Sequence, residues 1–328
     1  MTIQNRDAYY DVLRGLAIIM VIGIHTYADG AAHMNLFFRQ FLNCAVPIFL
    51  AISGFFIGKK SFQERGSYTS FLKKQVPRVY IPMVLWSIPW ALQAIHMGTA
   101  PIAAATYSLI GKFSIFYFII LIIQFYILTP LIQKLNYKHG GGYSVVITLI
   151  GISLFDYFLR IRGVNVGLLA SGGPFPVWMA FYVLGVLKAQ GLKIPFQTSK
   201  PLLAAFVALI LCCVHIAAFH AYNGCVVHGI KLTAHIYSYF IVMWLLSDSA
   251  RATISSTLPQ WATNFFATTG RLSFLIYLNH CIFIIAVAHL NLPSVWALRW
   301  ALSAAVSIAF ALCCDKLCPK AMRRYIGL

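Results

Sequence analysis

The stretch DVLRGLAIIMVIGIHTYADG, residues 11–30, decides how the whole chain is interpreted. Most of it is apolar enough to cross a bilayer as a helix, because about 20 apolar residues span the hydrocarbon core. Arg14 nevertheless stands near its start and His25 near its end. The question that this stretch raises is why a membrane helix keeps these two polar residues.

The composition of the 328 residues is that of a membrane protein. Hydrophobic residues make up 60% of the chain and charged residues only 10%, far from the averages of soluble domains. Lipid cannot satisfy backbone polar groups, so long apolar runs in a membrane must be helical. We therefore expect an all-α, polytopic integral membrane protein with about ten transmembrane helices. We also expect a single domain over residues 1–328, with no separate soluble domain.

The expected spans follow the apolar runs of the chain. They are residues 11–28, 41–58, 79–97, 113–132, 143–159, 174–190, 201–221, 229–247, 272–290 and 294–314.

The distribution of basic residues predicts the orientation of the spans. With the N-terminus inside, eighteen of the 25 Lys and Arg residues fall in the N-terminal segment, the inner loops and the C-terminal tail. Six fall in the outer loops and helix edges, namely Arg39, Lys112, Arg160, Arg162, Lys231 and Arg299. The positive-inside rule then places both termini in the cytoplasm. The net charge of +18 is spread over short loops, so we expect no nucleic-acid partner.

Two other interpretations of the sequence are less favoured. A cleaved signal peptide at the N-terminus would need an uninterrupted apolar core, and Arg14 interrupts it. Cys313, Cys314 and Cys318 cluster near the end of the chain, but small residues packing at a helix end explain them better than a metal site does. We expect no metal and no disulfide framework.

Arg14 and His25 lie on nearly the same face of a helix, because eleven residues make almost three whole turns. They are separated by roughly 16 Å along the axis. Burying Arg in a membrane costs at least ~2.5 kcal/mol, so such residues usually face the bundle interior or a water-filled cavity. Asp11, one turn earlier, can pair with Arg14 and lower this cost. The alternative is that Arg14 extends to the headgroups and His25 only makes a packing contact.

The pattern of Arg, ten residues and His resembles the signature of acyltransferase family 3 membrane proteins. Further stretches resemble later elements of that family, in the family's order. They are VPIFLAISGFF (46–56), FLKKQVPRVYIP (71–82), LIIQFYILTPLI (121–132), FYVLGVL (181–187) and GRLSFLIYLNHCIFI (270–284). Lys73 and Lys74 stand where the family often has arginine, and Asn279 stands where an apolar residue is usual.

The resemblance implies transfer of an acyl group, usually acetyl, from cytoplasmic acyl-CoA to a hydroxyl of a cell-envelope glycan or lipid-linked saccharide. It implies a multi-pass protein of the bacterial inner membrane, in contact with membrane lipids. Acetyl-CoA or another acyl-CoA is then a substrate, and no cofactor is bound permanently.

The residues suit that chemistry. His25 is the candidate base for the hydroxyl proton, since the pKa of histidine lies near neutrality, and Asp29 could orient its ring. Arg14 is the second catalytic candidate, holding the donor below His25. Phosphates of the donor need cations, and Arg78, Lys74 and Lys73 are the candidates, although such loops are also basic for topology alone.

Other polar residues could line the same cavity. They are Asp11, Ser53, Tyr126, Ser273, Tyr277 and His280. Ser273, Tyr277 and His280 form a stripe at helical spacing, which could equally join helices by hydrogen bonds. Ser53 with Gly54 could instead permit close helix packing.

A transporter or flippase of an envelope precursor is the rival class, with Arg14 and His25 as substrate or proton sites. It is less favoured because no repeat with interrupted helices is evident in the sequence. A purely structural membrane partner would leave Arg14 unexplained.

Overall fold

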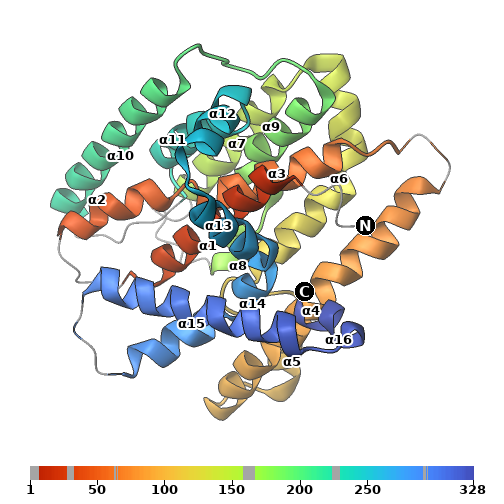
Figure 1. The fold of residues 1–328 in the computed structure, drawn as a ribbon, viewed down its shortest axis with the longest axis vertical. Coiled ribbons are helices and arrows are strands. Elements are labelled where there is room, and N and C mark those ends of the chain that lie inside the picture. The colour runs from red at the N-terminus through yellow and green to blue at the C-terminus, as the bar shows by residue number, and fades with distance from the viewer. Residues whose placement is uncertain are drawn as a thin grey trace.

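Helices form the architecture seen in the computed structural model (Figure 1). The structure describes residues 7–27, 33–62, 64, 66–157, 167–223, 230–290, 293 and 295–328, and these residues form no strand. The helices are α1 Ala8–His25, α2 His33–Leu42, α3 Ala45–Gly58, α4 Ser67–His96, α5 Pro101–Leu109, α6 Tyr117–His139, α7 Gly142–Asp156, α8 Leu168–Gly172, the 3₁₀ helix η3 Phe175–Trp178, α9 Met179–Gln190, α10 Pro201–Asn223, α11 Leu232–Leu245, α12 Asp248–Thr257, α13 Gln260–Arg271, α14 Ser273–Ala288, α15 Trp296–Leu317 and α16 Lys320–Ile326.

Several helices are long and apolar enough to cross a membrane. Five meet this description by themselves: Ala8–His25, Phe37–Gly58, Tyr117–His139, Pro201–Ala218 and Trp296–Leu317. The pair α13 and α14, bent by 81°, makes a sixth if it is counted as one span. The protein is therefore helical and of the membrane type, as expected. The count of ten spans stays a prediction.

The remaining predicted spans coincide with helices that are shorter or more polar. Gly142–Phe155, Phe175–Gln190 and Leu232–Leu245 are apolar but short. The predicted span 79–97 lies in α4, a helix of 30 residues that begins with a basic segment and contains Pro77, Pro82 and Pro89. Proline removes a backbone donor and weakens a helix locally, which suits α4 to bending along its length.

The outer surface of the bundle is strongly apolar. Helix α10 exposes large side chains along one face: Leu203, Phe206, Val207, Ile210, Leu211 and Val214. A patch of this kind would be unfavourable in water and is expected of a helix that faces lipid. The hydrophobic outer face therefore agrees with the membrane assignment.

Helix α1 lies near the middle of the molecule, with α15 crossing beneath it in Figure 1. It packs against α13, α3, α14, α15 and α2. Glycines allow this close approach: a Cβ at Gly270 would overlap the carbonyl oxygen of Asp11, and one at Gly15 would overlap the carbonyl oxygen of Phe266. Small residues bring membrane helices together in this way. The stretch that opens the sequence argument is thus a central helix.

A second close pair joins α3 to α9. A Cβ at Gly54 would overlap the carbonyl oxygen of Tyr182, and one at Gly185 would overlap that of Ala51. Gly54 therefore serves helix packing, the role that the sequence favoured for it. Ser53 beside it is half-buried.

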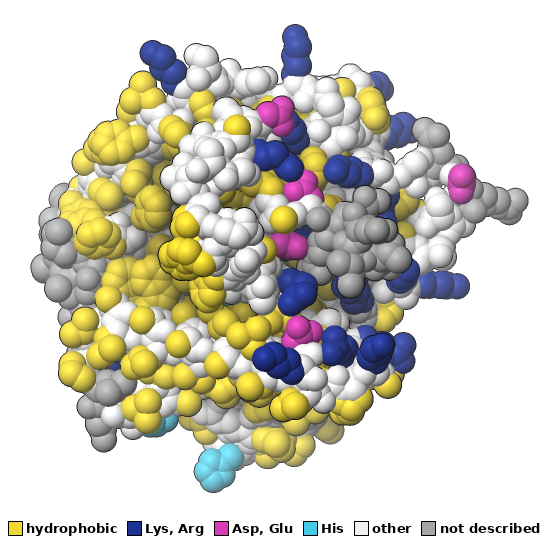
Figure 2. Space-filling view, viewed as in Figure 1, with side chains coloured by type: hydrophobic (Ala, Val, Ile, Leu, Met, Phe, Trp, Pro, Cys, Tyr) yellow, Lys and Arg dark blue, Asp and Glu magenta, His cyan; other side chains and the backbone are white. Residues whose placement is uncertain are grey.

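Charge is distributed unevenly over the surface. Figure 2 shows Lys and Arg side chains at the top, near the centre and on the right-hand side of one face, and Figure 1 draws the start of α4 on that right-hand side. Hydrophobic side chains cover most of the left and lower parts of that face. Such a division is expected when one end of a bundle lies at a membrane surface.

Candidate active site

The first turns of α1 place Arg14 beside an acid and an aromatic ring. Its Nη1 atom lies 3.0 Å from Oδ1 of the buried Asp11. Its Cζ atom lies 4.9 Å from the centroid of the Phe56 ring on α3. The ion pair expected from the sequence is confirmed. Arg14 is therefore held within the bundle by Asp11 and by a cation–π contact.

Arg14 shares its surroundings with two other candidate residues. The charges of both Arg14 and Arg78 act on the hydroxyl of Tyr126, a buried residue of α6. The Tyr126 ring packs edge-on against Phe71 of α4, with centroids 5.6 Å apart. Residues from α1, α4 and α6 thus converge at one end of the bundle.

The cations of α4 are open to their surroundings. Lys73, Lys74 and Arg78 are all exposed. Across the chain segments that the structure covers, Arg78 forms no ion pair. An exposed guanidinium without an acidic partner can bind a phosphate through two parallel hydrogen bonds.

Two lysines that the sequence did not single out as site residues belong to the same end. Lys59 lies with Nζ 4.1 Å from the centroid of the Phe55 ring, and Lys60 lies 5.9 Å from that of Phe71. The sequence held a signal, since the two lysines stand three and four residues after Phe56 of the Ser-Gly-Phe element. Lys59 shares the Phe56 ring with Arg14, with Nζ 5.9 Å from its centroid, and Lys60 lies beside the Phe71 ring that packs on Tyr126.

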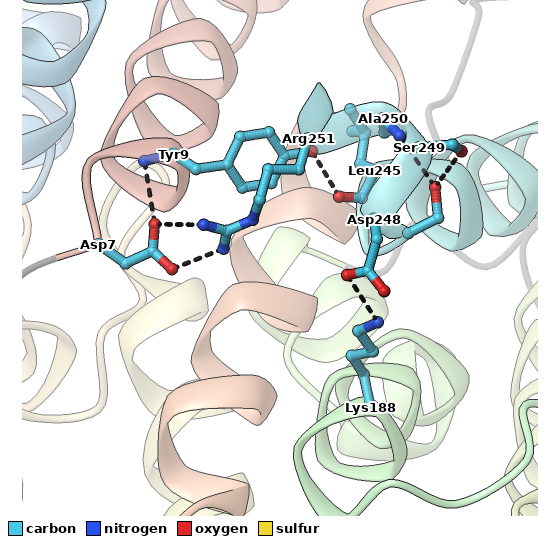
Figure 3. Close-up of polar contacts among 9 residues, drawn as sticks. Asp7, Tyr9, Lys188, Leu245, Asp248, Ser249, Ala250 and Arg251 are labelled. Atoms are coloured by element: carbon cyan, nitrogen blue, oxygen red, sulfur yellow. Dashed lines mark hydrogen bonds and ion pairs between the residues drawn. The ribbon is translucent and has the colours of Figure 1, made fainter. Parts of the chain in front are cut away.

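A polar cluster fastens the start of α1 to α12, and a second joins α12 to α9 (Figure 3). Arg251 donates to both carboxylate oxygens of Asp7, at 3.1 and 2.6 Å. The Tyr9 hydroxyl donates to the carbonyl oxygen of Leu245 at 2.6 Å. Lys188 of α9 pairs with Asp248 at 3.4 Å. Hydrogen bonding to Asp7 raises the pKa of Arg251, which therefore stays charged.

His25 stands at the other end of α1. It is exposed, whereas the residues Ile22, Gly23 and Thr26 around it are buried. Its ring centroid lies 5.5 Å from that of His280 on α14. The fold therefore brings together two histidines that are 255 positions apart in the chain. His25 is exposed, whereas His280 beside it is fully buried.

His280 is fully buried and oriented by its own helix. Its Nδ1 atom lies 3.2 Å from the carbonyl oxygen of Ile276 and 2.9 Å from that of Tyr277. Its Nε2 atom is buried and has no hydrogen-bond partner among the described residues. His280 therefore uses Nδ1 for hydrogen bonds within α14, while Nε2 is left for another partner.

The other two residues of the predicted stripe on α14 are Ser273 and Tyr277. The Tyr277 hydroxyl donates to the carbonyl oxygen of Ile115, and its ring packs against Phe118 at 5.6 Å. Ser273 is buried at the first residue of α14. Of the three stripe residues, His280 is therefore the one next to His25.

Arg39 of α2 is a further residue near His25. The charge of Arg39 acts on His25, and its Cζ atom lies 5.2 Å from the centroid of the Tyr27 ring. From the sequence alone, Arg39 is predicted only as a basic residue of an outer loop or helix edge. Its role could not be predicted because α2 is a separate helix that turns back toward α1. Asp29, the other proposed neighbour of His25, lies outside the described residues.

The long apolar helices, the basic end and the polar residues along α1 define a membrane-embedded helical protein with a candidate site at each end of one central helix. The chain belongs to acyltransferase family 3: the family's acyltransferase domain matches residues 7–316. That match covers nearly the whole chain and confirms the resemblance. Searches of curated proteins and of solved structures gave no match.

Proposed function

We propose that this membrane acyltransferase moves an acyl group, most simply acetyl, from cytoplasmic acyl-CoA to a hydroxyl of a cell-envelope saccharide. The bacterial inner membrane is the proposed location. The observation that carries the proposal is that Arg14 and His25 lie on one unbroken helix at the centre of the bundle. Arg14 shares one end with the cation Arg78, and His25 is exposed beside His280 at the other.

The cationic end is the proposed donor site. Cations and aromatic rings alternate there: the cations are Arg14, Arg78, Lys59 and Lys60, and the rings are those of Phe55, Phe56, Phe71 and Tyr126. Two exposed lysines, Lys73 and Lys74, extend the positive charge along α4. Acyl-CoA offers phosphates for the cations and an adenine ring for aromatic stacking. From there the pantetheine arm points along α1, and the thioester is carried toward His25.

His25 is the proposed general base. It removes the proton of the acceptor hydroxyl while the oxygen forms a bond to the thioester carbon. The carbon–sulfur bond then breaks, and the proton passes from His25 to the departing thiolate. The products are the acylated saccharide and free CoA, so no cofactor and no net proton change are needed.

A transfer assay tests the proposal. Purified protein in lipid vesicles receives acetyl-CoA and a saccharide extract from cells that lack the protein. Free CoA thiol should appear in step with acetylated saccharide detected by mass spectrometry. Movement of unmodified saccharide across the vesicle without thioester cleavage would support a transporter instead. Comparing glycans of cells with and without the protein identifies the acceptor.

The predicted orientation needs its own test. Glu64, between α3 and α4, and Met97, at the end of α4, are both exposed. In a cysteine-free background, Glu64→Cys should react with a membrane-impermeant reagent only from the cytoplasmic side, and Met97→Cys only from outside. Labelling of position 64 from outside would overturn the orientation and with it the donor site.

A further inference from the structure

The hydrogen bonds of His280 determine which of its nitrogens carries a proton. Carbonyl oxygens only accept, so Nδ1, which faces the carbonyls of Ile276 and Tyr277, must be the N–H group. In the neutral ring, Nε2 is then an acceptor with a free lone pair. The local backbone of α14 thus presets His280 as a hydrogen-bond acceptor at Nε2.

That acceptor has no partner within the described parts of the molecule. Nε2 is buried, and an unsatisfied buried polar atom is destabilising unless another state of the protein satisfies it. The His25 ring lies beside it, with centroids 5.5 Å apart and planes inclined by 44°. His25 has a ring N–H to donate in either neutral tautomer.

We propose that His280 is the positioning residue of His25: in the reacting state its Nε2 accepts the ring N–H of His25. This inference rests on the proposed function of His25 as base. The bond assigns the proton of His25 to the nitrogen that faces His280. The other nitrogen of His25 is then a lone pair directed at the acceptor hydroxyl.

The proton balance of the reaction is kept. The acceptor hydroxyl gives its proton to the free nitrogen of His25 as the new carbon–oxygen bond forms. The same proton leaves with the CoA thiolate as the carbon–sulfur bond breaks. His280 keeps its Nδ1 proton throughout and stabilises the transient His25 imidazolium through the hydrogen bond at Nε2.

Two substitutions of His280 separate orientation from packing. His280→Leu fills the space but offers no acceptor, whereas His280→Gln supplies a carbonyl oxygen. We expect His280→Leu to lower kcat about 10- to 100-fold, as for a misplaced catalytic group, with the KM for acyl-CoA unchanged. His280→Gln should recover part of that loss. Asn279→Ala is the matched control. Asn279 precedes His280 on α14 and is equally buried, with side-chain atoms that have no partner among the described residues, but it is no part of the site.

A double-mutant cycle gives the decisive readout. If His280 acts only through His25, the variant His25→Gln with His280→Leu should transfer at the rate of His25→Gln alone. If the double variant instead loses activity by the product of the two single losses, His280 acts independently of His25 and the proposal is overturned. Equal kcat values for His280→Leu and His280→Gln, whether both normal or both reduced, in protein whose thermal midpoint is unchanged, would also overturn it.

The cycle also separates this inference from the proposed function. An active His25→Gln variant refutes the base itself. An inactive His25→Gln variant combined with a fully active His280→Leu variant refutes only the positioning role.

Discussion

The polar residues at the two ends of α1 have different surroundings. At the first turns, acids and bases are paired: Asp7 with Arg251, and Asp11 with Arg14. At the last turn, His25 is exposed beside His280, whose Nε2 has no partner in the described chain. Polar residues in a membrane helix therefore have two uses here. One end is fastened by ion pairs, and the other places an exposed histidine beside a buried nitrogen atom without a partner among the described residues.

The energetics of the two ends differ accordingly. Partly exposed ion pairs such as Asp7–Arg251 contribute about 0–1 kcal/mol each, so they position α1 more than they stabilise it. A buried polar atom without a partner costs about 1–3 kcal/mol. Such a cost is typical of functional sites, where a sequence departs from the rules that favour stability. The unpartnered Nε2 of His280 is thus one of two observations at the His25 end, beside the approach of the two histidine rings.

The largest change in free energy is expected for a substitution where α1 packs against α13. Gly270→Ala places a methyl group against the carbonyl of Asp11, and backbone must move to accommodate it. We expect a loss of stability at the upper end of the overpacking range, about 3 kcal/mol, seen as a lower thermal midpoint in detergent. Gly142→Ala is the control, since a Cβ there meets nothing within 4 Å. An unchanged midpoint for Gly270→Ala would show that α1 is not fixed by α13.

The next effect concerns the donor. Arg78→Ala should weaken acyl-CoA binding by about 1.5 to 3 kcal/mol, the worth of a hydrogen bond to a charged group. Calorimetry with CoA measures this directly. Lys138→Ala removes an exposed cation of the predicted cytoplasmic side at the end of α6 and should bind normally. Equal binding by both variants and the unmodified protein would remove Arg78 from the donor site.

The smallest effect is expected at the fastened end itself. Asp7→Asn weakens the pair with Arg251 but keeps a side chain of the same shape, so stability should fall by no more than about 1 kcal/mol. The transfer rate should change little, because Asp7 lies at the start of α1 and His25 at its end. A large loss of transfer at unchanged stability would mean that Asp7 itself takes part in the reaction.

Much of this arrangement could be predicted from the sequence. The apolar run of α1, its Arg14 and His25, and the Asp11–Arg14 pair follow from local spacing, which a helix converts directly into geometry. The family motifs indicated the acyltransferase class. The predicted apolar runs coincide with helices, although α7, α9 and α11 are short for a full span.

The contacts between distant helices could not be predicted. The approach of His280 to His25 depends on the bend between α13 and α14, and nothing in the hydropathy of residues 260–288 reveals an 81° angle. The charge of Arg39 acts on His25 across the packing of α2 against α1, which hydropathy does not reveal either. In the sequence, Lys59 and Lys60 indicate only the orientation of the spans. Their aromatic neighbours Phe55 on α3 and Phe71 on α4 are evident only in the structure. Spacing describes one helix at a time, whereas these sites are built from several.

The most direct test of the account measures two properties of His25→Gln in one preparation. Glutamine keeps a polar side chain but cannot accept and release the proton near neutral pH. Transfer should fall by about 100-fold or more, the range of a positioned acid–base group, while acyl-CoA binding by calorimetry stays normal. His289→Gln, at an exposed histidine after α14, should keep both properties. Near-normal transfer by His25→Gln would contradict the claim that the unpaired end of α1 carries the chemistry.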